Sequence, residues 1–401
     1  MKVLVISHMY PSTANEVSGI FVHEQVKALI SKGVEIRVVS PVPWAPFPVN
    51  QMTDKWQAYS RIPQSCVWDG VEVFYPRYVV FPRAWFFATS GQRMYRGIRK
   101  VVEKIYHEFP FDLIHAHVAL PDGYAGALIC RDLGLPLVVT IHGQDLQHTV
   151  YRGSQCREAL SYALAGANRV IVVGQKLKRL MEYFFPSEKE KVVIVPNGID
   201  PEKINQAMVT FCLKREKGPL IVSVSNLVKT KGVDLNLQAI HRLRHKYPTL
   251  RYLVVGDGPE FLALKKLTRQ LHLEEHVQFV GRVPHQQALQ YIASCDVFSL
   301  PSWSEGFGIV YLEAMACGKP VVGCKGEGVE DFVEHGITGL LVEPKSVVSL
   351  VEALDFLLSF PDKAKAMGER ARGVVLANYT WEKNAEKTIA VYREVLNEYE
   401  R

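Results

Sequence analysis

Short runs of Val, Ile and Leu recur along the chain, and they limit its fold more than any other feature. Six runs in the first half lie at Val3 to Ser7, Ile36 to Ser40, Leu113 to Ala116, Leu137 to Ile141, Val170 to Val173 and Val192 to Val195. Longer segments with helical spacing separate most of them. Strands that are apolar on both faces are typical of a parallel sheet with helices on each side. This half is therefore predicted to be a doubly wound α/β domain.

The second half repeats the same pattern. Its runs lie at Leu220 to Val224, Tyr252 to Val255, Val277 to Val280, Val297 to Leu300, Pro320 to Val322 and Gly339 to Val342. With 401 residues and 48% hydrophobic content, the chain has material for two such domains. The Pro-Asn-Gly at 196–198 ends a strand and predicts the boundary, with domains at 1–197 and 198–378.

Two further segments stand apart from this repeat. From about 379 to 401 no strand follows, and an amphipathic helix is predicted with Trp381, Ala385, Ile389, Tyr392 and Leu396 on its apolar side. The stretch from Trp44 to Phe87 is rich in Pro and aromatic residues and has weak strand signals only, near Val71 to Tyr75 and Tyr78 to Val80. It is predicted to form long loops, which often contact substrates.

The start of the chain and its cysteines favour a cytoplasmic protein that is not exported. The apolar run from Val3 to Ile6 is too short for a signal peptide, and no stretch reaches the ~20 apolar residues of a membrane helix. The cysteines are odd in number, scattered and free of C-x-x-C spacing, at Cys66, Cys130, Cys156, Cys212, Cys295, Cys317 and Cys324. Buried thiols are expected rather than disulfides or zinc ligands.

The positive charge gathers in the first half. Through Asn197 there are 22 Lys and Arg against 16 Asp and Glu, whereas the remainder holds 25 of each. An acidic acceptor, an anionic membrane surface or an ordinary solvated surface would each account for this excess; no nucleic-acid partner is expected. A basic helix with an apolar stripe is predicted around Gln92 to Phe109, after Trp85, Phe86 and Phe87. The stripe is formed by Met94, Ile98, Val101 and Ile105, and it would either contact a membrane or pack in the core.

The segment at 301–320 reads PSWSEGFGIVYLEAMACGKP and carries the most specific pattern in the chain. A strand ends at Leu300, a glycine-containing loop follows, and a short helix is predicted from near Ile309 to Gly318, where glycine permits a left-handed cap. The helix thus begins at the carboxyl edge of a parallel sheet. The backbone amides of Gly308, Ile309 and Val310 would point there at an anion such as phosphate.

Two carboxylates flank the start of this helix. Glu305 lies in the preceding loop, and Glu313 lies about one turn inside the helix. They can therefore accept hydrogen bonds from one ligand at two heights, one from sugar hydroxyls and one from a ribose. The alternative is that both merely cap and solvate the helix, which their combined spacing disfavours.

Glu305 and Glu313, separated by seven residues, resemble the E-x7-E signature of retaining glycosyltransferases of family 4, which have the GT-B fold. The surrounding EGFGIVYLEAMACGKPVV is similar to that family almost residue for residue. The resemblance extends over the chain through MKVLVIS at 1–7, GIFVHE at 19–24, TIHGQD at 140–145, PNGID at 196–200, Lys231-Gly232 and VGDGP at 255–259. It implies two Rossmann-like domains facing a cleft, an N-terminal one for the acceptor and a C-terminal one for the nucleotide-sugar, with the last helix packed back on the first.

The resemblance also implies roles for single residues. Glu305 is expected to contact the transferred sugar, Glu313 the ribose, and Lys231 the leaving diphosphate, while His142 approaches the donor sugar from the N-terminal domain. The donor set further includes Gly19, Asn226, Arg282, Val283, Phe307, Gly308, Ile309 and Val310. The expected acceptor set is Tyr10, His117 and Asp145.

The chain departs from the family pattern at one donor position. Where the family commonly has Gly-Arg-Leu, this sequence reads Ser225-Asn226-Leu227, so one phosphate-binding cation is missing. Asn226 binds the phosphate instead, Lys229 replaces the arginine, or turnover is weaker; the sequence leaves these open. Arg282 is equally a base contact or a surface arginine.

Retaining transfer in the family implies attack by the acceptor oxygen from the side of the leaving group, so charge stabilisation and orientation are the main tasks. With no Asp-x-Asp signature in the relevant loop, no metal and no cofactor are expected. UDP-sugars are the favoured donors, and polysaccharide or lipid-linked glycans the favoured acceptors. The alternatives are an epimerase or phosphorylase, and a non-catalytic nucleotide-sugar-binding scaffold. An NAD-dependent enzyme is excluded because the first strand runs into His8-Met9-Tyr10 and not into G-x-G-x-x-G.

Overall fold

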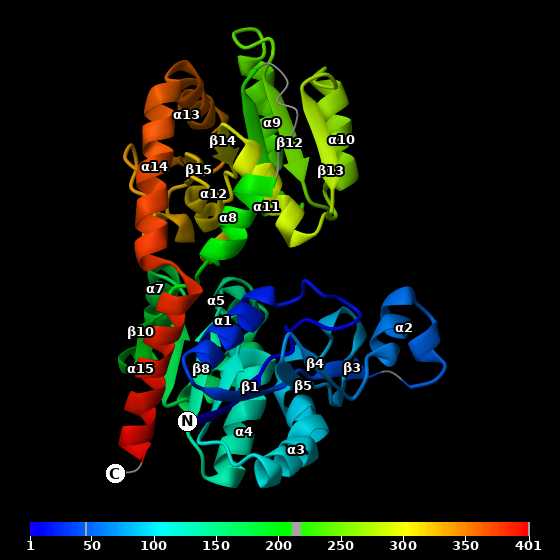
Figure 1. Cartoon of the computed structure of the whole chain (residues 1–401). Coiled ribbons are helices and arrows are strands. Elements are labelled where there is room, and N and C mark those ends of the chain that lie inside the picture. The colour runs from blue at the N-terminus through cyan, green and yellow to red at the C-terminus, as the bar shows by residue number, and fades with distance from the viewer. Residues whose placement is uncertain (45, 211–217, 400–401) are drawn as a thin grey trace. The chain divides into compact units, whose positions relative to one another are not determined.

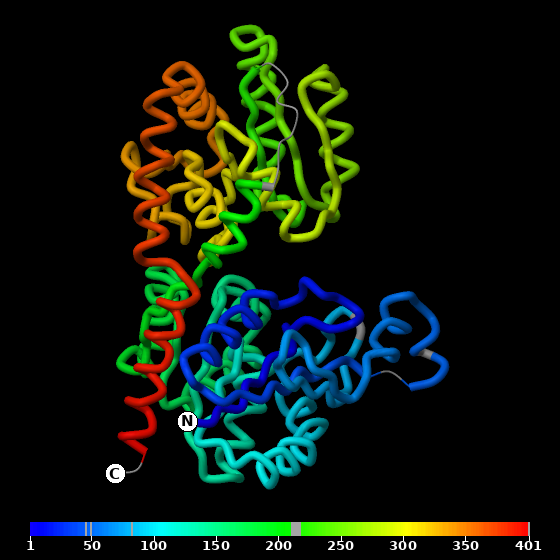
Figure 2. Tube along the Cα trace, in the orientation of Figure 1, coloured from blue at the N-terminus to red at the C-terminus, as the bar shows by residue number. Residues whose placement is uncertain are grey.

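The computed structural model describes residues 1–44, 46–210 and 218–399, so that Cys212 lies outside the described residues. The chain divides into two compact units. The N-terminal unit comprises Met1–Pro196 together with Trp381–Arg401, and the C-terminal unit comprises Asn197–Thr380. Figures 1 and 2 trace both units from blue to red. The division falls at the Pro-Asn-Gly segment.

The N-terminal unit is built on an eight-stranded sheet in the order β10-β9-β8-β7-β1-β2-β5-β4. All neighbouring strands pair in parallel except β4, which is antiparallel to β5. The strands are β1 (Lys2–Ile6), β2 (Glu35–Val39), β4 (Ser65–Trp68), β5 (Val71–Phe74), β7 (Leu113–His117), β8 (Leu137–Ile141), β9 (Arg169–Val172) and β10 (Val192–Ile194). The chain order reverses between β1 and β7, which makes that point the topological switch of the sheet.

Helices cover this sheet, including one from the far end of the sequence. They are α1 (Ile20–Ser31), α2 (Asp54–Arg61), α3 (Ser90–Glu108), α4 (Tyr124–Leu133), α5 (Gln144–Gln147), α6 (Ser154–Ala165), α7 (Gln175–Phe184) and α15 (Trp381–Tyr399). Helix α15 lies against α1, where Gln25 Nε2 donates to Asn384 Oδ1 over 2.7 Å. Tyr392 of α15 is fully buried, so the last helix is part of the core of this unit.

The stretch from Trp44 to Phe87 is more ordered than the expected long loops. It contains α2, and β4 and β5 extend the main sheet beyond β2. A separate two-stranded ribbon pairs β3 (Val42–Trp44) in parallel with β6 (Arg77–Val79). β5 and β6 lie where the weak strand signals were found, whereas α2 and β4 were predicted as loop. Short elements of this kind depend on tertiary packing and pairing, which no local pattern shows.

The C-terminal unit has a six-stranded parallel sheet in the order β13-β12-β11-β14-β15-β16. The strands are β11 (Leu220–Val224), β12 (Arg251–Val255), β13 (Val277–Gly281), β14 (Val297–Ser299), β15 (Val321–Cys324) and β16 (Gly339–Val342). Numbered within the unit, this is the order 3-2-1-4-5-6 of a dinucleotide-binding sheet, with its switch point between β11 and β14. The predicted α/β class, with two doubly wound domains, is confirmed.

The helices of the C-terminal unit bury apolar residues against its sheet. They are α8 (Pro201–Thr210), α9 (Val233–Leu243), α10 (Phe261–Gln270), α11 (His285–Ser294), α12 (Ile309–Ala316), α13 (Val347–Ser359) and α14 (Pro361–Asn378). The core includes Ile221 and Tyr252 from the strands and Leu237 from α9, all fully buried. Helix α12 is the short helix expected after the glycine-containing loop, and Gly318 just beyond it has a φ of 71°.

The apolar stripe predicted on α3 faces the core. Met94, Ile98 and Ile105 are at most 1% exposed, and Val102 rather than Val101 completes the buried face. The stripe therefore packs inside the protein, and a lipid contact through it is wrong. Among the residues that the structure describes, no helix is long and apolar enough to cross a membrane.

Candidate active site

The switch point of the C-terminal unit brings two predicted donor residues into contact. Lys231 follows β11 and Glu305 follows β14, and Lys231 Nζ lies 2.5 Å from Glu305 Oε2. The two side chains are 21% and 14% exposed, so the pair is partly shielded from water but open to a ligand. Residues 74 apart in sequence meet here because the carboxyl ends of neighbouring parallel strands share one edge of the sheet.

Further contacts fix the loop that carries Glu305. Its backbone N–H donates to Glu327 Oε2 over 2.6 Å, and its carbonyl accepts from Gly328 N–H over 3.3 Å. The buried Tyr311 donates its hydroxyl hydrogen bond to the carbonyl of Leu300 and so ties α12 to the end of β14. The carboxylate of Glu305 is thus held on a rigid loop rather than on a mobile one.

Two glycines at this edge have backbone conformations in which any other residue would be strained. Gly232 precedes α9 with a φ of 69°, and a Cβ there would lie 2.4 Å from the carbonyl oxygen of Pro301. Gly308 precedes α12 with a φ of 91°, and a Cβ would lie 2.6 Å from the ring of Tyr311. Both helix starts point their first amides, including those of Ile309 and Val310, out of the helix without intrahelical partners. Close backbone approach and free amides are what a phosphate group requires.

Glu313 has a partner that the sequence did not indicate. Its Oε1 lies 2.6 Å from Nε2 of His285, the first residue of α11. Glu313 is 12% exposed and His285 42% exposed, so the imidazole is the accessible member of the pair. The histidine was missed because it lies 28 residues from Glu313 and belongs to no short motif.

Lys229, one candidate to replace the missing arginine, has an acidic partner of its own. Its Nζ lies 2.6 Å from Asp234 Oδ2, and this hydrogen bond raises the pKa of the lysine. Asn226 is exposed beside β11, and a Cβ on Gly258 would lie 2.9 Å from its Oδ1. Two neighbouring hydroxyls, of Ser225 and Ser302, are buried without a hydrogen-bond partner among the described residues. The site thus offers neutral polar groups where a second cation was expected.

The remaining donor candidates differ in accessibility. Arg282 is exposed just after β13, and Val283 beside it is half-buried. Phe307 is 3% exposed, with its ring packed against those of Phe332 and Tyr379. Its side chain therefore packs in the core, and a donor contact at Phe307 stays a prediction. The sequence could not separate the two because glycine on both sides made the whole loop look accessible.

Histidines cluster at the carboxyl ends of β7 and β8 in the N-terminal unit. His117 Nδ1 lies 3.0 Å from His142 Nε2, and their rings stack with an interplanar angle of 8°. Burial lowers the pKa of His142 to about 3 and that of His117 well below its usual value, so both are neutral at pH 7. His117 Nε2 and His142 Nδ1 have no hydrogen-bond partner among the described residues. Both nitrogens are shielded from solvent in this structure.

A carboxylate network lies beside these histidines at the switch point between β1 and β7. His8 Nδ1 lies 2.8 Å from Oδ2 of the buried Asp122. Asp145 accepts backbone hydrogen bonds from Ala119 and Leu120, and burial raises its pKa to about 6. Burial alone would lower the pKa of His8, but the facing carboxylates of Asp122 and Asp145 raise it. Asp145 therefore shapes the loop after β7, and His8, which the sequence did not single out, is the half-exposed member.

The other N-terminal candidates occupy structural positions. Tyr10 is 2% exposed, and its hydroxyl lies 2.8 Å from Nδ1 of His23. The side chain is thus enclosed in the core, and its assignment as an acceptor contact stays a prediction. Gly19 precedes α1 with a φ of 60°, and a Cβ would lie 2.0 Å from the carbonyl oxygen of Met9. Only glycine fits this close approach of two loop segments.

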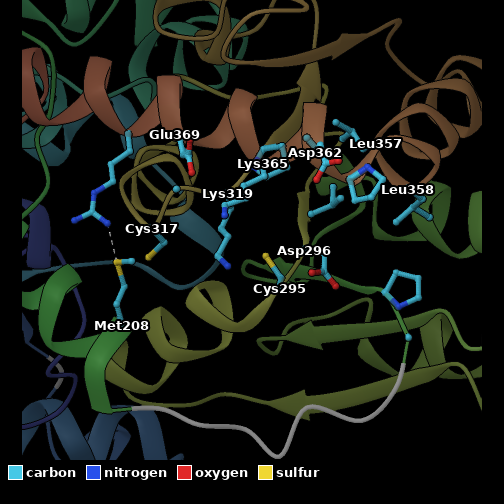
Figure 3. Close-up of a pocket in the computed structure, with 18 residues that line it drawn as sticks. Met208, Cys295, Asp296, Cys317, Lys319, Leu357, Leu358, Asp362, Lys365 and Glu369 are labelled. Carbon is cyan, nitrogen blue, oxygen red and sulfur yellow. Dashed lines mark hydrogen bonds between the residues drawn. The ribbon is translucent and has the colours of Figure 1, made fainter.

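A pocket of about 730 Å³ in the C-terminal unit lies away from this site. It is lined by residues that precede strands, including Pro219, Asp296 and Lys319, and so lies at the amino edge of the sheet. Figure 3 shows Lys319 and Lys365 beside Asp362 and Glu369 around it. Nucleotides bind at the carboxyl edge of such sheets. The Lys231–Glu305 edge, not this pocket, is therefore the candidate donor site.

Comparisons with known proteins agree with this geometry. Residues 205–374 match the family model described as glycosyl transferases group 1, and residues 18–203 match that of glycosyltransferase family 4. A glycosyltransferase of Bacillus subtilis, provisionally assigned to teichuronic acid biosynthesis, is 30% identical over 88% of each chain. A GDP-mannose-dependent phosphatidylinositol monomannoside mannosyltransferase of Mycolicibacterium smegmatis is 29% identical over 73% of this chain and 82% of its own.

Solved structures show the same fold. Sucrose-phosphate synthase from Thermosynechococcus elongatus aligns with a TM-score of 0.81 at 21% identity, covering 99% of both chains. Anabaena HepE in complex with UDP and glucose aligns with a TM-score of 0.74 at 19% identity, covering 98% of this chain and 100% of its own. The two sheets with their switch points, the Lys231–Glu305 pair and these matches lead to one conclusion. The chain belongs to the group 1, or family 4, glycosyltransferases and is an enzyme of the GT-B fold.

Proposed function

We propose that this glycosyltransferase moves a sugar, with retention of its anomeric configuration, from a nucleotide diphosphate sugar to a polysaccharide or lipid-linked glycan. UDP-sugars are the favoured donors, and no metal is required. The observation that carries the proposal is the contact of Lys231 with Glu305 at the switch point of the C-terminal unit. It supplies a cation for a diphosphate and a carboxylate for sugar hydroxyls at one position.

When the donor binds, Lys231 and Glu305 give up their ion pair, and each side chain contacts the donor instead. The diphosphate takes Lys231 as its partner, and the free amides at the start of α12 bind its oxygens. Glu305 then accepts hydrogen bonds from the transferred sugar, and Glu313 from the ribose. As the bond between the anomeric carbon and the diphosphate breaks, Lys231 stabilises the negative charge that develops on the leaving group. A lysine and helix amides at this position are the support for metal independence.

The N-terminal unit is proposed to contact the sugar through neutral groups. His142 and His117 each retain an unpaired ring nitrogen in a neutral ring. Such nitrogens exchange hydrogen bonds with hydroxyls without placing a positive charge near the sugar, whose anomeric carbon becomes positively charged during transfer. The acceptor hydroxyl forms the new bond, and its proton passes to the departing phosphate oxygen.

One experiment tests the reaction. Purified enzyme is incubated with UDP-, GDP- and ADP-sugars, and release of the nucleoside diphosphate is followed with EDTA present and with added magnesium. We expect release from a UDP-sugar that EDTA leaves unchanged and that Glu305→Gln lowers by roughly 10²–10³-fold. Activity that appears only with added metal would contradict metal independence, and a preference for GDP- or ADP-sugars would contradict the UDP assignment. A scaffold protein would release nothing from any donor.

A peripheral membrane contact of the N-terminal unit is a second proposal, with a different surface from the one predicted on α3. Trp85 and Phe86 are 59% and 68% exposed, and exposed Arg83 lies beside them. Aromatic side chains next to basic ones favour anionic lipid surfaces. Flotation with anionic liposomes, reduced in a Trp85→Ala and Phe86→Ala double variant, supports the contact. Equal behaviour with neutral liposomes removes it.

A cytoplasmic location is proposed on the state of the cysteines. Cys66, Cys130, Cys156, Cys295, Cys317 and Cys324 are free thiols, and all but Cys66 are buried. Proteins in reducing compartments keep thiols in this form. Nucleotide-sugars as donors fit the same compartment.

A further inference from the structure

A second cavity, of about 290 Å³, lies in the N-terminal unit beside the β3–β6 ribbon. Six residues line it: Pro43, Trp44, Asn50, Trp56, Ser60 and Arg77. Trp44 ends β3 and Arg77 begins β6, whereas Trp56 and Ser60 lie four residues apart on one face of α2. The cavity volume is near the lower end of the ~300–1,000 Å³ range of small-molecule sites. It is therefore suited to a ligand as small as one sugar ring.

Two indole rings give this cavity apolar walls. Trp44 is 46% exposed, and Trp56 is half-buried on α2. Thr53 caps the first turn of that helix by accepting from the backbone N–H of Trp56, and the ring of Trp56 packs edge-on against Tyr59 at 6.2 Å. The cap thus holds the backbone at Trp56, and Tyr59 packs beside its ring. Large exposed indoles held in place are efficient contact surfaces because little side-chain freedom is lost on binding.

The polar groups of the cavity have hydrogen-bonding capacity left over. Asn50 Oδ1 is shielded from solvent and has no hydrogen-bond partner among the described residues. Leaving such an acceptor unpaired costs roughly 1–3 kcal/mol, which a ligand hydroxyl could offset. Ser60 Oγ donates to the carbonyl of Gln57 and keeps its lone pairs as acceptors. One Nη of Arg77 donates to the carbonyl of Tyr59 over 2.7 Å, and the other donates to the carbonyl of Ile62. These bonds hold the guanidinium in place and leave it further N–H groups for a ligand.

We propose that this cavity between the β3–β6 ribbon and α2 binds a sugar ring of the acceptor glycan, away from the reacting hydroxyl. A sugar ring has apolar C–H faces for Trp44 and Trp56 and hydroxyl groups at its edge for Asn50, Ser60 and Arg77. A lipid chain would satisfy the indoles but leave the amide and guanidinium without partners. The role as an acceptor subsite rests on the proposed function, whereas the binding of a sugar does not.

The test measures sugar binding directly. Methyl glycosides of glucose, galactose, N-acetylglucosamine and glucuronic acid are titrated against the full chain and followed by saturation-transfer NMR. Variants Trp44→Ala and Asn50→Ala probe the cavity through an exposed indole and a small amide. Trp85→Ala is the matched control, because Trp85 is 59% exposed and does not line the cavity. UDP binding in the same samples verifies folding.

The inference predicts that at least one glycoside binds the wild-type chain and the Trp85→Ala variant equally. Its Kd is expected to rise roughly two- to tenfold in Trp44→Ala, because a stacked aromatic contact contributes ~0.5–1.5 kcal/mol, and to rise in Asn50→Ala as well. No glycoside binding by a chain that still binds UDP, or equal binding by all variants, would overturn the inference alone. Loss of UDP binding and transfer with glycoside binding intact would instead overturn the proposed function.

Discussion

The two switch points of this enzyme have the same topology and opposite electrostatics. In the C-terminal unit, a lysine and a carboxylate meet 2.5 Å apart and are partly exposed. In the N-terminal unit, the same position holds His117 and His142, whose pKa values burial lowers so that both are neutral, beside the carboxylates of Asp122 and Asp145. The first arrangement suits a doubly charged diphosphate, and the second suits uncharged sugar hydroxyls. One sheet architecture therefore supports two kinds of recognition, according to the residues that follow its strands.

Burial explains why the two points differ. Lys231 and Glu305 retain contact with solvent, so their charges are hydrated until a ligand replaces the water. His115, which donates or accepts at Tyr392 and Thr140, is fully enclosed beside His117. Charging an enclosed imidazole costs its hydration energy, which lowers its pKa.

The largest effect is expected from removing the charge of Glu305 at the C-terminal switch point. Glu305→Gln keeps the shape of the side chain but removes its charge, and we expect the transfer rate to fall by roughly 10²–10³-fold, as when a preorganised polar contact to the transition state is lost. Asp234→Asn is the matched control, because its pairing with Lys229 is of the same kind but belongs to no proposed substrate contact. Initial rates with a saturating donor check this. Equal losses in both variants would remove the special role of Glu305.

A glycine at the same switch point is expected to affect stability. In Gly232→Ala the new Cβ would meet the carbonyl of Pro301 at 2.4 Å while φ stays positive. We expect a loss of about 2–3 kcal/mol in the free energy of unfolding. Gly134 also has positive φ, but a Cβ there would meet no other part of the protein within 4 Å, so Gly134→Ala should cost only about 1 kcal/mol. Urea unfolding of both variants compares them, and similar costs would contradict the account of close packing.

The neutral switch point is expected to respond to pH. The pKa of His115 is about 3 in the folded protein against 6.5 when exposed, so the unfolded chain binds more protons between these values. The contribution of His115 to the free energy of unfolding is therefore present above pH 6.5 and is lost as the pH falls. From pH 7 to pH 5 we expect wild type to lose about 2 kcal/mol that His115→Gln does not lose.

Asp145, at the same switch point, is expected to change the stability with pH in the opposite direction. Its pKa is about 6 in the folded protein against 3.8 when exposed, so the folded chain holds its proton longer and stability falls as the pH rises from 4 to 6. In wild type, protonation of Asp145 on acidification therefore adds stability and offsets part of the loss from the histidines. Asp145→Asn lacks this gain, so its free energy of unfolding should fall more steeply as the pH falls. Urea unfolding between pH 5 and pH 7 measures both variants. Parallel pH profiles for wild type, His115→Gln and Asp145→Asn would contradict the assigned shifts.

The smallest effect is expected from adding a positive charge at the C-terminal switch point. Asn226→Arg restores the cation that the family pattern has at this position, and we expect UDP to bind roughly two- to fivefold more tightly, since the added contact is exposed. Asn378→Arg adds the same charge at an exposed position on α14 and should leave the affinity unchanged. Isothermal titration of both variants measures this. A gain in both would reveal only a general electrostatic effect.

The sequence predicted the fold well where strands are apolar on both faces. The runs at Leu137 to Ile141 and Leu220 to Val224 coincide with β8 and β11, because burial on both faces leaves mainly apolar residues in them. It failed for β4, a four-residue strand at a sheet edge, in which Val67 is exposed and Trp68 is half-buried. Such strands depend on pairing with β5, a long-range contact that no local pattern encodes.

The site was predictable in part for the same reason. Glu305, Glu313 and Lys231 lie in short motifs, and the sheet topology brings Lys231 and Glu305 together. His285 and His8 were missed because their partners, Glu313 and Asp122, lie far away in the sequence. The burial of Tyr10 and Phe307 was not predictable, because an aromatic residue in a glycine-containing or proline-containing loop gives no signal of whether it faces solvent or the core.

The central claim is that the C-terminal switch point binds the nucleotide diphosphate through Lys231. Isothermal titration of UDP into wild type, Lys231→Ala, Lys229→Ala and His142→Ala tests it most directly. We predict a Kd at least about tenfold weaker in Lys231→Ala, equivalent to the loss of one charge-assisted contact, and near-wild-type values in the other two variants. UDP binding by Lys231→Ala as tight as that of wild type would contradict the account.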